Sequence, residues 1–283
     1  MSMSTAPLPL RQALPDLARW TALFQAVEIP VLAQTAAALE LLRGDEDAVD
    51  ANSLGEMIAT DPLMTLKVLV HAAKLASRRS SGLLTDVETV TAALVLMGIT
   101  PFFREFGPQP TVEDRLADHP QALHGLQRVL RRADRSARFA LGFAIHRLDP
   151  DAAVLHSAAM LHDFAEMLLW VHAPDLALQL DARRIAEPLE RSVALQRALL
   201  HIELGELEQA LMKAWRLPEL LAHMTDDRRA NDPQVQSVRL AVRLARHTAD
   251  GWDNAAVPDD VSEIGILLNM GPEHALKLLH EFD

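Results

Sequence analysis

The chain of 283 residues has no cysteine and no tyrosine, and it is poor in glycine and in aromatic residues. Without cysteine, the protein can have no disulfide, no thiolate metal site and no cysteine nucleophile. With only 11 glycines and 4% aromatic residues, a collagen-like or linker composition is excluded, and most stacking platforms for single-stranded nucleic acid are missing. The lack of cysteine permits a reducing cytoplasm, which is where we expect the protein to act.

Long apolar runs are also missing. The longest uncharged run covers residues 89–103 and is interrupted by Gly98 and Pro101, so it is too short and too broken to span a bilayer. The N-terminal residues lack the basic-then-apolar order of a signal peptide. We therefore expect no interaction with a membrane.

Positive charge is scarce, because 27 Lys and Arg residues face 39 Asp and Glu residues and leave a net charge of −12. An acidic protein repels polyphosphate at long range, so nucleic-acid binding is disfavoured unless the basic residues cluster. Apolar side chains are abundant: hydrophobic residues make up 49% of the chain. That is enough to build the core of one large domain or of two modest ones.

The apolar residues recur with helical periodicity nearly throughout the chain. Two helix starts are predicted from capping boxes, Ser53 with Glu56 and Thr85 with Glu88. Helices are expected at about residues 30–42, 53–60, 62–73, 85–97, 120–147, 151–172, 188–200, 206–215, 233–249 and 259–282, the last broken at Gly271-Pro272. No stretch alternates polar and apolar residues with β-branched enrichment, so the sequence predicts an all-α fold without a sheet.

The clearest break in the helical pattern is the segment Gly107-Pro108-Gln109-Pro110. We use it to divide the chain into an N-terminal tail (1–14), a first helical lobe (15–108), a second lobe (113–250) and a C-terminal helical extension (251–283) packed on the second lobe. Because the linker is short and each lobe is small, we expect the lobes to pack into one compact unit.

Five segments, at residues 58–65, 72–76, 92–99, 159–166 and 201–205 followed by 215–218, carry short motifs in a fixed order. The residues that define several of these motifs are Asp61, Pro62, His162, Asp163, His201, Gly205, Trp215 and Pro218. Each motif is weak alone, but the set resembles the HDOD family, the HD-related output domains of bacterial signalling proteins, over roughly residues 29–247. The resemblance implies two packed helical lobes, the second an HD-like bundle related to the HD phosphohydrolases.

In an active HD site, a divalent cation is held by a histidine on an early helix, a His-Asp pair and a distant aspartate. This chain keeps the pair as His162 and Asp163. We align Arg135 with the early histidine and Val242 with the distant aspartate, and Glu166 replaces the lysine that follows the pair in relatives. Because a cation needs more than two adjacent ligands and arginine repels it, we expect a degenerate site that binds neither a metal nor another cofactor.

Without a cation, the carboxylate of Asp163 needs another positive or hydrogen-bonding partner if it is buried. The helix predicted at residues 120–147 offers arginines at about the right place. We predict a salt bridge between Asp163 and one arginine of the segment 128–138, with Arg131 and Arg135 as the favoured residues.

Five arginines, Arg128, Arg131, Arg132, Arg135 and Arg138, are spaced to lie on one face of that helix. The simplest interpretation is that they pair with acidic residues of neighbouring helices or are solvated. An alternative is a surface for an anion or an acidic partner, because guanidinium groups bind carboxylate and phosphate bidentately. Binding of double-stranded nucleic acid is the least favoured alternative.

These features together predict a non-catalytic regulatory or interaction module that serves as an output of signal transduction. Its expected partner is another signalling protein, with a small molecule or nucleotide as a further option, and homo-oligomerisation is left open. Two other functions remain as alternatives. One is a metal-dependent HD-type phosphohydrolase, and the other is nucleotide or nucleic-acid binding through the arginine face.

Overall fold

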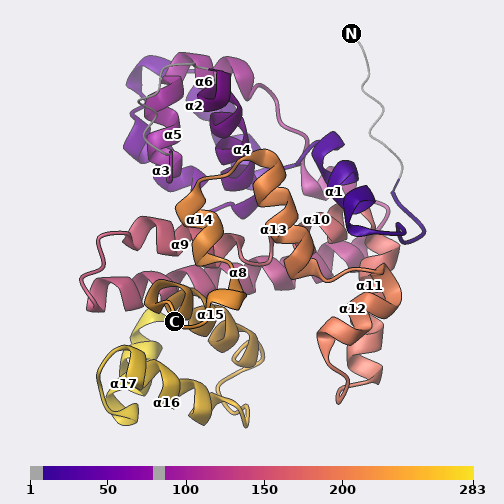
Figure 1. The fold of residues 1–283 in the computed structure, drawn as a ribbon. Coiled ribbons are helices and arrows are strands. Elements are labelled where there is room, and N and C mark those ends of the chain that lie inside the picture. Colours follow the sequence, from indigo (N-terminus) through magenta and orange to yellow (C-terminus); the bar gives the residue numbers. More distant parts are fainter. Residues whose placement is uncertain (1–8, 79–86) are drawn as a thin grey trace.

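The structure, a computed structural model, describes residues 9–78 and 87–283, and these ranges are helical apart from their connections (Figure 1). The helices are α1 (Leu17–Ala26), α2 (Ala33–Arg43), η1 (Glu46–Ala48), α3 (Ala51–Ile58), α4 (Pro62–Arg78), α5 (Val90–Met97), α6 (Ile99–Glu105), α7 (Val112–Arg115), α8 (Pro120–His146), α9 (Ala152–Leu161), α10 (Phe164–His172), α11 (Pro174–Ala186), α12 (Ser192–Leu200), α13 (Leu204–Trp215), α14 (Glu219–Met224), η2 (Asp227–Arg229), α15 (Pro233–His247), α16 (Val257–Leu267) and α17 (Pro272–Phe282). The only extended pairing in the described ranges is an isolated bridge between Val31 and Thr111. The all-α prediction is confirmed. None of the helices in these ranges is long and apolar enough to cross a membrane.

Two predicted helix starts are wrong. Helix α3 is capped by Asp50, whose carboxylate accepts hydrogen bonds from two amides of the first turn, so Ser53 lies inside the helix. Helix α5 is capped by the hydroxyl of Thr89, whereas the predicted cap Thr85 lies outside the described residues. Asp, Ser and Thr are all good N-caps, so where several occur within one turn the sequence does not show which one is used.

The single helix predicted over residues 151–172 is broken in two. Helix α9 ends at Leu161 and α10 begins at Phe164, so the His-Asp pair lies in the connection. The backbone of Asp163 has φ −110° and ψ 21°, outside the helical region, and the chain changes direction there. The break places Asp163 beside α8 and α15 and His162 beside η2, which no periodicity in the sequence indicates. Helix α11, which begins at Pro174, was not predicted either.

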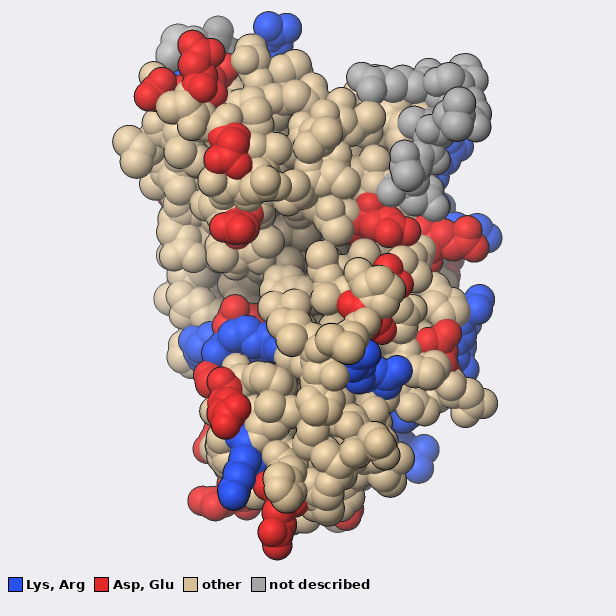
Figure 2. Space-filling model, turned by 90° about the vertical axis from the view of Figure 1, so that its left-hand side faces the viewer, with Lys and Arg blue, Asp and Glu red and all other residues tan. Residues whose placement is uncertain are grey.

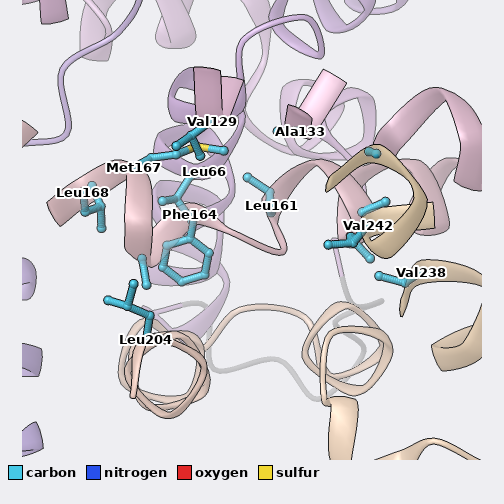
Figure 3. Close-up of a cluster of buried hydrophobic side chains, with 14 of the residues drawn as sticks. Leu66, Val129, Ala133, Leu161, Phe164, Met167, Leu168, Leu204, Val238 and Val242 are labelled. Atoms are coloured by element: carbon cyan, nitrogen blue, oxygen red, sulfur yellow. The ribbon is translucent and has the colours of Figure 1, made fainter. Parts of the chain in front are cut away.

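Two hydrophobic cores meet at α4. The smaller core is built by α2, α3, α5 and α6, and the larger one by α1 and the helices from α8 onward. Met64 of α4 is buried in the smaller core, while Leu66 is buried in the larger one. Figure 3 shows Leu66 among Val129, Phe164 and Met167 of the second lobe. Helix α4 therefore joins the two lobes.

The start of α4 is held by Asp61, which is fully buried. Its Oδ1 accepts hydrogen bonds from the amides of Leu63 (2.9 Å) and Met64 (3.1 Å), and its Oδ2 accepts one from the amide of Leu32 just before α2 (2.9 Å). Burial raises the pKa of this carboxyl, and the three amides act against that rise. The motif residues Asp61 and Pro62 thus start α4 and fix it to α2.

The N-terminal helix packs on the second lobe. The indole N–H of Trp20 in α1 donates a hydrogen bond to the carbonyl of Leu200 at the end of α12 (3.0 Å), and α1 lies against α13. At the other end of the chain, α16 and α17 pack on α15 and α8. The predicted boundaries at residues 15, 108–113 and 251 stay predictions. Helices α1 and α4 precede the boundary at residues 108–113, but both pack against helices that follow it.

We predict that both lobes unfold in a single transition, because α4 contributes to both cores. All four tryptophans (Trp20, Trp170, Trp215 and Trp252) lie in or against the larger core, so their fluorescence reports on that core and not on the smaller one. Far-UV circular dichroism reports on the helices of both lobes. The two signals should give the same midpoint in urea; a circular-dichroism transition that begins before the fluorescence change would show that the lobes unfold separately.

Candidate functional site

A pocket of about 520 Å³ opens beside the connection between α9 and α10. Its walls come from α8, α10 to α13, η2 and α15, so residues far apart in the sequence meet there. The ionisable residues that line it are Arg132, His162, Asp163, Glu166, Arg184, Glu203, Glu206, Glu208, Asp226, Asp227, Arg228 and Arg246. A pocket of this size is typical of small-molecule sites.

Asp163 is bound by two arginines from different helices. Nη2 of Arg132 in α8 lies 3.1 Å from Oδ2, and Nη2 of Arg246 in α15 lies 2.5 Å from Oδ1. Burial by itself would raise the pKa of Asp163, but Arg246, His162 and Arg132 hold it well below its usual value. Asp163 is therefore a carboxylate whose two oxygens both already have positive partners.

His162 has both ring nitrogens engaged as well. Nδ1 lies 3.4 Å from Oδ1 of Asp163, and Nε2 lies 3.2 Å from Oδ1 of Asp227 in η2. Burial acts to lower the pKa of His162, but the hydrogen bonds to these two carboxylates outweigh it and raise the pKa to about 10. The ring is consequently a buried imidazolium that donates to both carboxylates.

Glu166 extends this ion-pair network toward α11. Its Oε2 lies 3.0 Å from Nη2 of Arg132, and its Oε1 accepts from Nη1 of Arg184 at 2.8 Å. Burial would raise the pKa of Glu166, while Arg184 and Arg132 lower it. The glutamate that replaces the usual lysine therefore bridges two arginines.

Glu208, on α13, is the exception in the pocket. Its side chain is buried, with 4% of the residue exposed, and it has no hydrogen bond or ion pair with any described residue. Burial raises its pKa well above the usual value, and the nearby His162 only partly offsets this. The sequence contains no signal for it, because a glutamate on an amphipathic helix is normally solvated.

The divalent cation of the HD phosphohydrolases does not fit these residues. Arg132 and Arg246 place two guanidinium groups on the aspartate that would ligate the metal, and the imidazolium of His162 has no free lone pair. Within the described ranges, no group of three or more His, Cys, Asp or Glu residues is placed to hold a metal ion.

The structure corrects two expected members of the site. The predicted salt bridge from Asp163 to an arginine of α8 is confirmed, but its partner is Arg132 and not the favoured Arg131 or Arg135. Arg135 instead forms a bidentate pair with Asp283 (2.6 and 2.7 Å). These arginines share one face of α8, and the packing of α8 on α9 determines which of them contacts Asp163. Val242 lies outside the pocket, in the hydrophobic cluster with Leu161 and Val238 (Figure 3). Helix α15 contributes Arg246, one turn further on, which the sequence did not reveal.

Most of the arginine face is paired within the protein. Arg128 pairs with Asp181 (2.5 Å), Arg138 pairs with Asp134 (3.0 Å), and Arg132 and Arg135 are paired as described above. Arg131 is exposed. On the face shown in Figure 2, Lys and Arg groups lie beside Asp and Glu groups and are separated from one another by uncharged surface. This arrangement favours the interpretation as internal pairing over a basic binding surface.

The remaining motif residues are structural or lie at the pocket rim. His201 ends α12 in a left-handed conformation (φ 63°), with Nδ1 3.1 Å from the carbonyl oxygen of Leu14. Trp215 packs against Phe164, with ring centroids 5.8 Å apart. Pro218 is the N-cap residue of α14. Gly205, exposed in the first turn of α13, lines the pocket.

The comparisons with known proteins agree with this architecture. The HDOD domain family matches residues 29–230, which is more than half of the chain. The MmoQ response regulator from Methylococcus capsulatus has a similar fold, with a TM-score of 0.67 and 22% identity over 89% of this chain and 98% of that chain. A virulence factor from Campylobacter jejuni has a TM-score of 0.65 and 17% identity over 93% of this chain and 94% of that chain. No curated protein sequence matches the chain. The family match and the shared all-α fold place this chain in the HDOD family.

Proposed function

We propose that the protein is a non-catalytic regulatory module of bacterial signal transduction, in which the site of an HD phosphohydrolase has become a network of ion pairs. The observation that carries this proposal is the state of the His-Asp pair. Both oxygens of Asp163 and both ring nitrogens of His162 are bonded to other side chains of the protein. None of these four atoms is left to ligate a metal or to activate water.

The electrostatics support the same proposal. A water activated for attack on a phosphoester needs a metal or a general base of suitable pKa. Asp163, with its pKa held well below its usual value by the arginines, is a weak base, and His162, with a pKa raised to about 10, holds its proton at neutral pH. The fold is shared with a protein described as a response regulator, and a role between signalling proteins would be consistent with that likeness.

We predict no phosphomonoesterase or phosphodiesterase activity with added Mn²⁺, Mg²⁺ or Fe²⁺. The assay uses p-nitrophenyl phosphate and bis(p-nitrophenyl) phosphate, with an active HD phosphohydrolase as the positive control. The wild-type protein should give the same background rate as a His162→Ala variant. Metal-dependent turnover that is lost in His162→Ala would contradict the proposal and restore the phosphohydrolase alternative.

A further inference from the structure

The pocket contains one buried acid that the ion-pair network leaves without a partner. The four arginines and the histidine that line the pocket are each paired with carboxylates, as described above for three arginines and His162, and Arg228 pairs with Asp226 at 2.8 Å. Glu208 is the buried carboxyl that no described residue contacts through a hydrogen bond or an ion pair. A buried polar group without a partner is costly, so this position fits a ligand that supplies a cationic N–H donor.

The same pocket also presents donors without acceptors. Arg184 lines the pocket, and only its Nη1 reaches Glu166, so Nη2 has no hydrogen-bond partner among the described residues. At the start of α13, the amides of Gly205 and Glu206 make no hydrogen bond to described residues, and the N-cap residue Glu203 gives no side-chain cap. Free amides at a helix N-terminus and a guanidinium N–H favour an oxygen anion.

We propose that this pocket binds a small zwitterion of the size of an amino acid or a dipeptide. Its ammonium group would lie on the carboxyl of Glu208, and its carboxylate on Nη2 of Arg184 and the amides of Gly205 and Glu206. This arrangement satisfies the unpaired acceptor and the unpaired donors at once. It also adds no net charge to a pocket whose other buried charged groups are already paired inside the protein.

The chemistry of the pocket distinguishes this ligand from two others. A metal ion would have to approach Glu208 beside the imidazolium of His162 and the guanidinium of Arg246, and the described residues offer it no set of ligands. A simple anion would leave Glu208 without a partner. Burial raises the pKa of Glu208 well above its usual value, which agrees with a buried carboxyl that no arginine or lysine of the protein pairs with.

The inference rests on the proposed function in one respect, namely that the pocket receives a ligand and not a substrate. The experiment therefore measures binding without turnover. Isothermal titration calorimetry on the whole chain would use the free amino acids, γ-aminobutyrate and glycylglycine, which together cover a range of separations between the two charges. For each binder, the amide lacks the carboxylate and the N-acetyl derivative lacks the ammonium group, so each half of the recognition is tested separately.

Two variants and a matched control test the assigned residues. Glu208→Gln removes the acid at nearly constant volume, and Arg184→Lys keeps a charge that can pair with Glu166 but removes the second guanidinium donor, Nη2. We expect each to weaken binding of the zwitterion about tenfold to a hundredfold, as for the loss of a hydrogen bond to a charged group. Lys213→Gln, an exposed position of the same helix that does not line the pocket, should change affinity by no more than about twofold.

The possible results separate the two proposals. If no zwitterion binds, or if the N-acetyl derivative binds as well as the parent, the inference is wrong while the non-catalytic function stands. Binding that Glu208→Gln leaves unchanged would also overturn it, as would preferential binding of inorganic phosphate. Chemical conversion of a bound zwitterion would instead contradict the proposed function.

Discussion

Replacing Asp163 by asparagine should lower the free energy of unfolding by about 3–5 kcal/mol, the range found when one partner of a buried ion pair is removed. The variant keeps the shape of the side chain but leaves Arg132, Arg246 and His162 with one carboxylate fewer between them. In the variant Arg132 still pairs with Glu166, whereas Arg246 loses the carboxylate with which it forms its ion pair. Urea unfolding followed by circular dichroism measures the change.

A surface pair serves as the control for this substitution. Asp134, whose side chain is 63% exposed, pairs with Arg138 four residues along the same helix. Asp134→Asn removes the same chemical group and should cost no more than about 0.5 kcal/mol. The double variant Asp163→Asn/Arg246→Gln should lose less stability than the sum of the single variants, because each removes the other's partner. Equal, small losses for Asp163→Asn and Asp134→Asn would contradict the buried network.

Stability should fall steeply as the pH rises above neutrality. His162 keeps its proton up to a pKa of about 10 in the folded protein, whereas the ordinary pKa of a histidine, 6.5, applies in the unfolded chain. Between these values the folded state binds more protons, so the free energy of unfolding decreases with rising pH, by up to about 1.4 kcal/mol per pH unit. The contribution of His162 is complete below pH 6.5, and about 3–5 kcal/mol of it should be lost by pH 10.

The same pH series on a His162→Gln variant isolates this residue. Glutamine can still donate a hydrogen bond to Asp163 or Asp227 but does not titrate. Burial also raises the pKa of Glu208. A carboxyl whose pKa is higher in the folded than in the unfolded protein likewise lowers the free energy of unfolding as the pH rises. The free energy of unfolding of the His162→Gln variant should therefore still decrease somewhat with rising pH. If wild type and His162→Gln lose stability in parallel from pH 6.5 to 9.5, the imidazolium assigned to His162 is wrong.

Local sequence signals were enough for the helices that a proline or a run of regular periodicity defines. The starts of α4, α8, α15 and α17 at Pro62, Pro120, Pro233 and Pro272 agree with the pattern, since proline fixes the backbone angle of a first helical turn. The His-Asp pair and the ordered motifs were likewise readable, because they depend on residue identity and spacing along the chain. These signals are properties of single segments.

The partners inside the pocket depend instead on how the helices pack. Arg132, Arg131 and Arg135 share one face of α8, and only the rotation of α8 against the α9–α10 break brings Arg132 to Asp163. Arg246 reaches the same carboxylate from 83 residues away, a pairing that no local pattern encodes. The sequence pattern around Glu208 is that of a surface residue, and only the packing of α13 at the pocket shows that its side chain is buried. Charge pairing and burial act through space across several helices, so they appear only when the packing of the whole bundle is known.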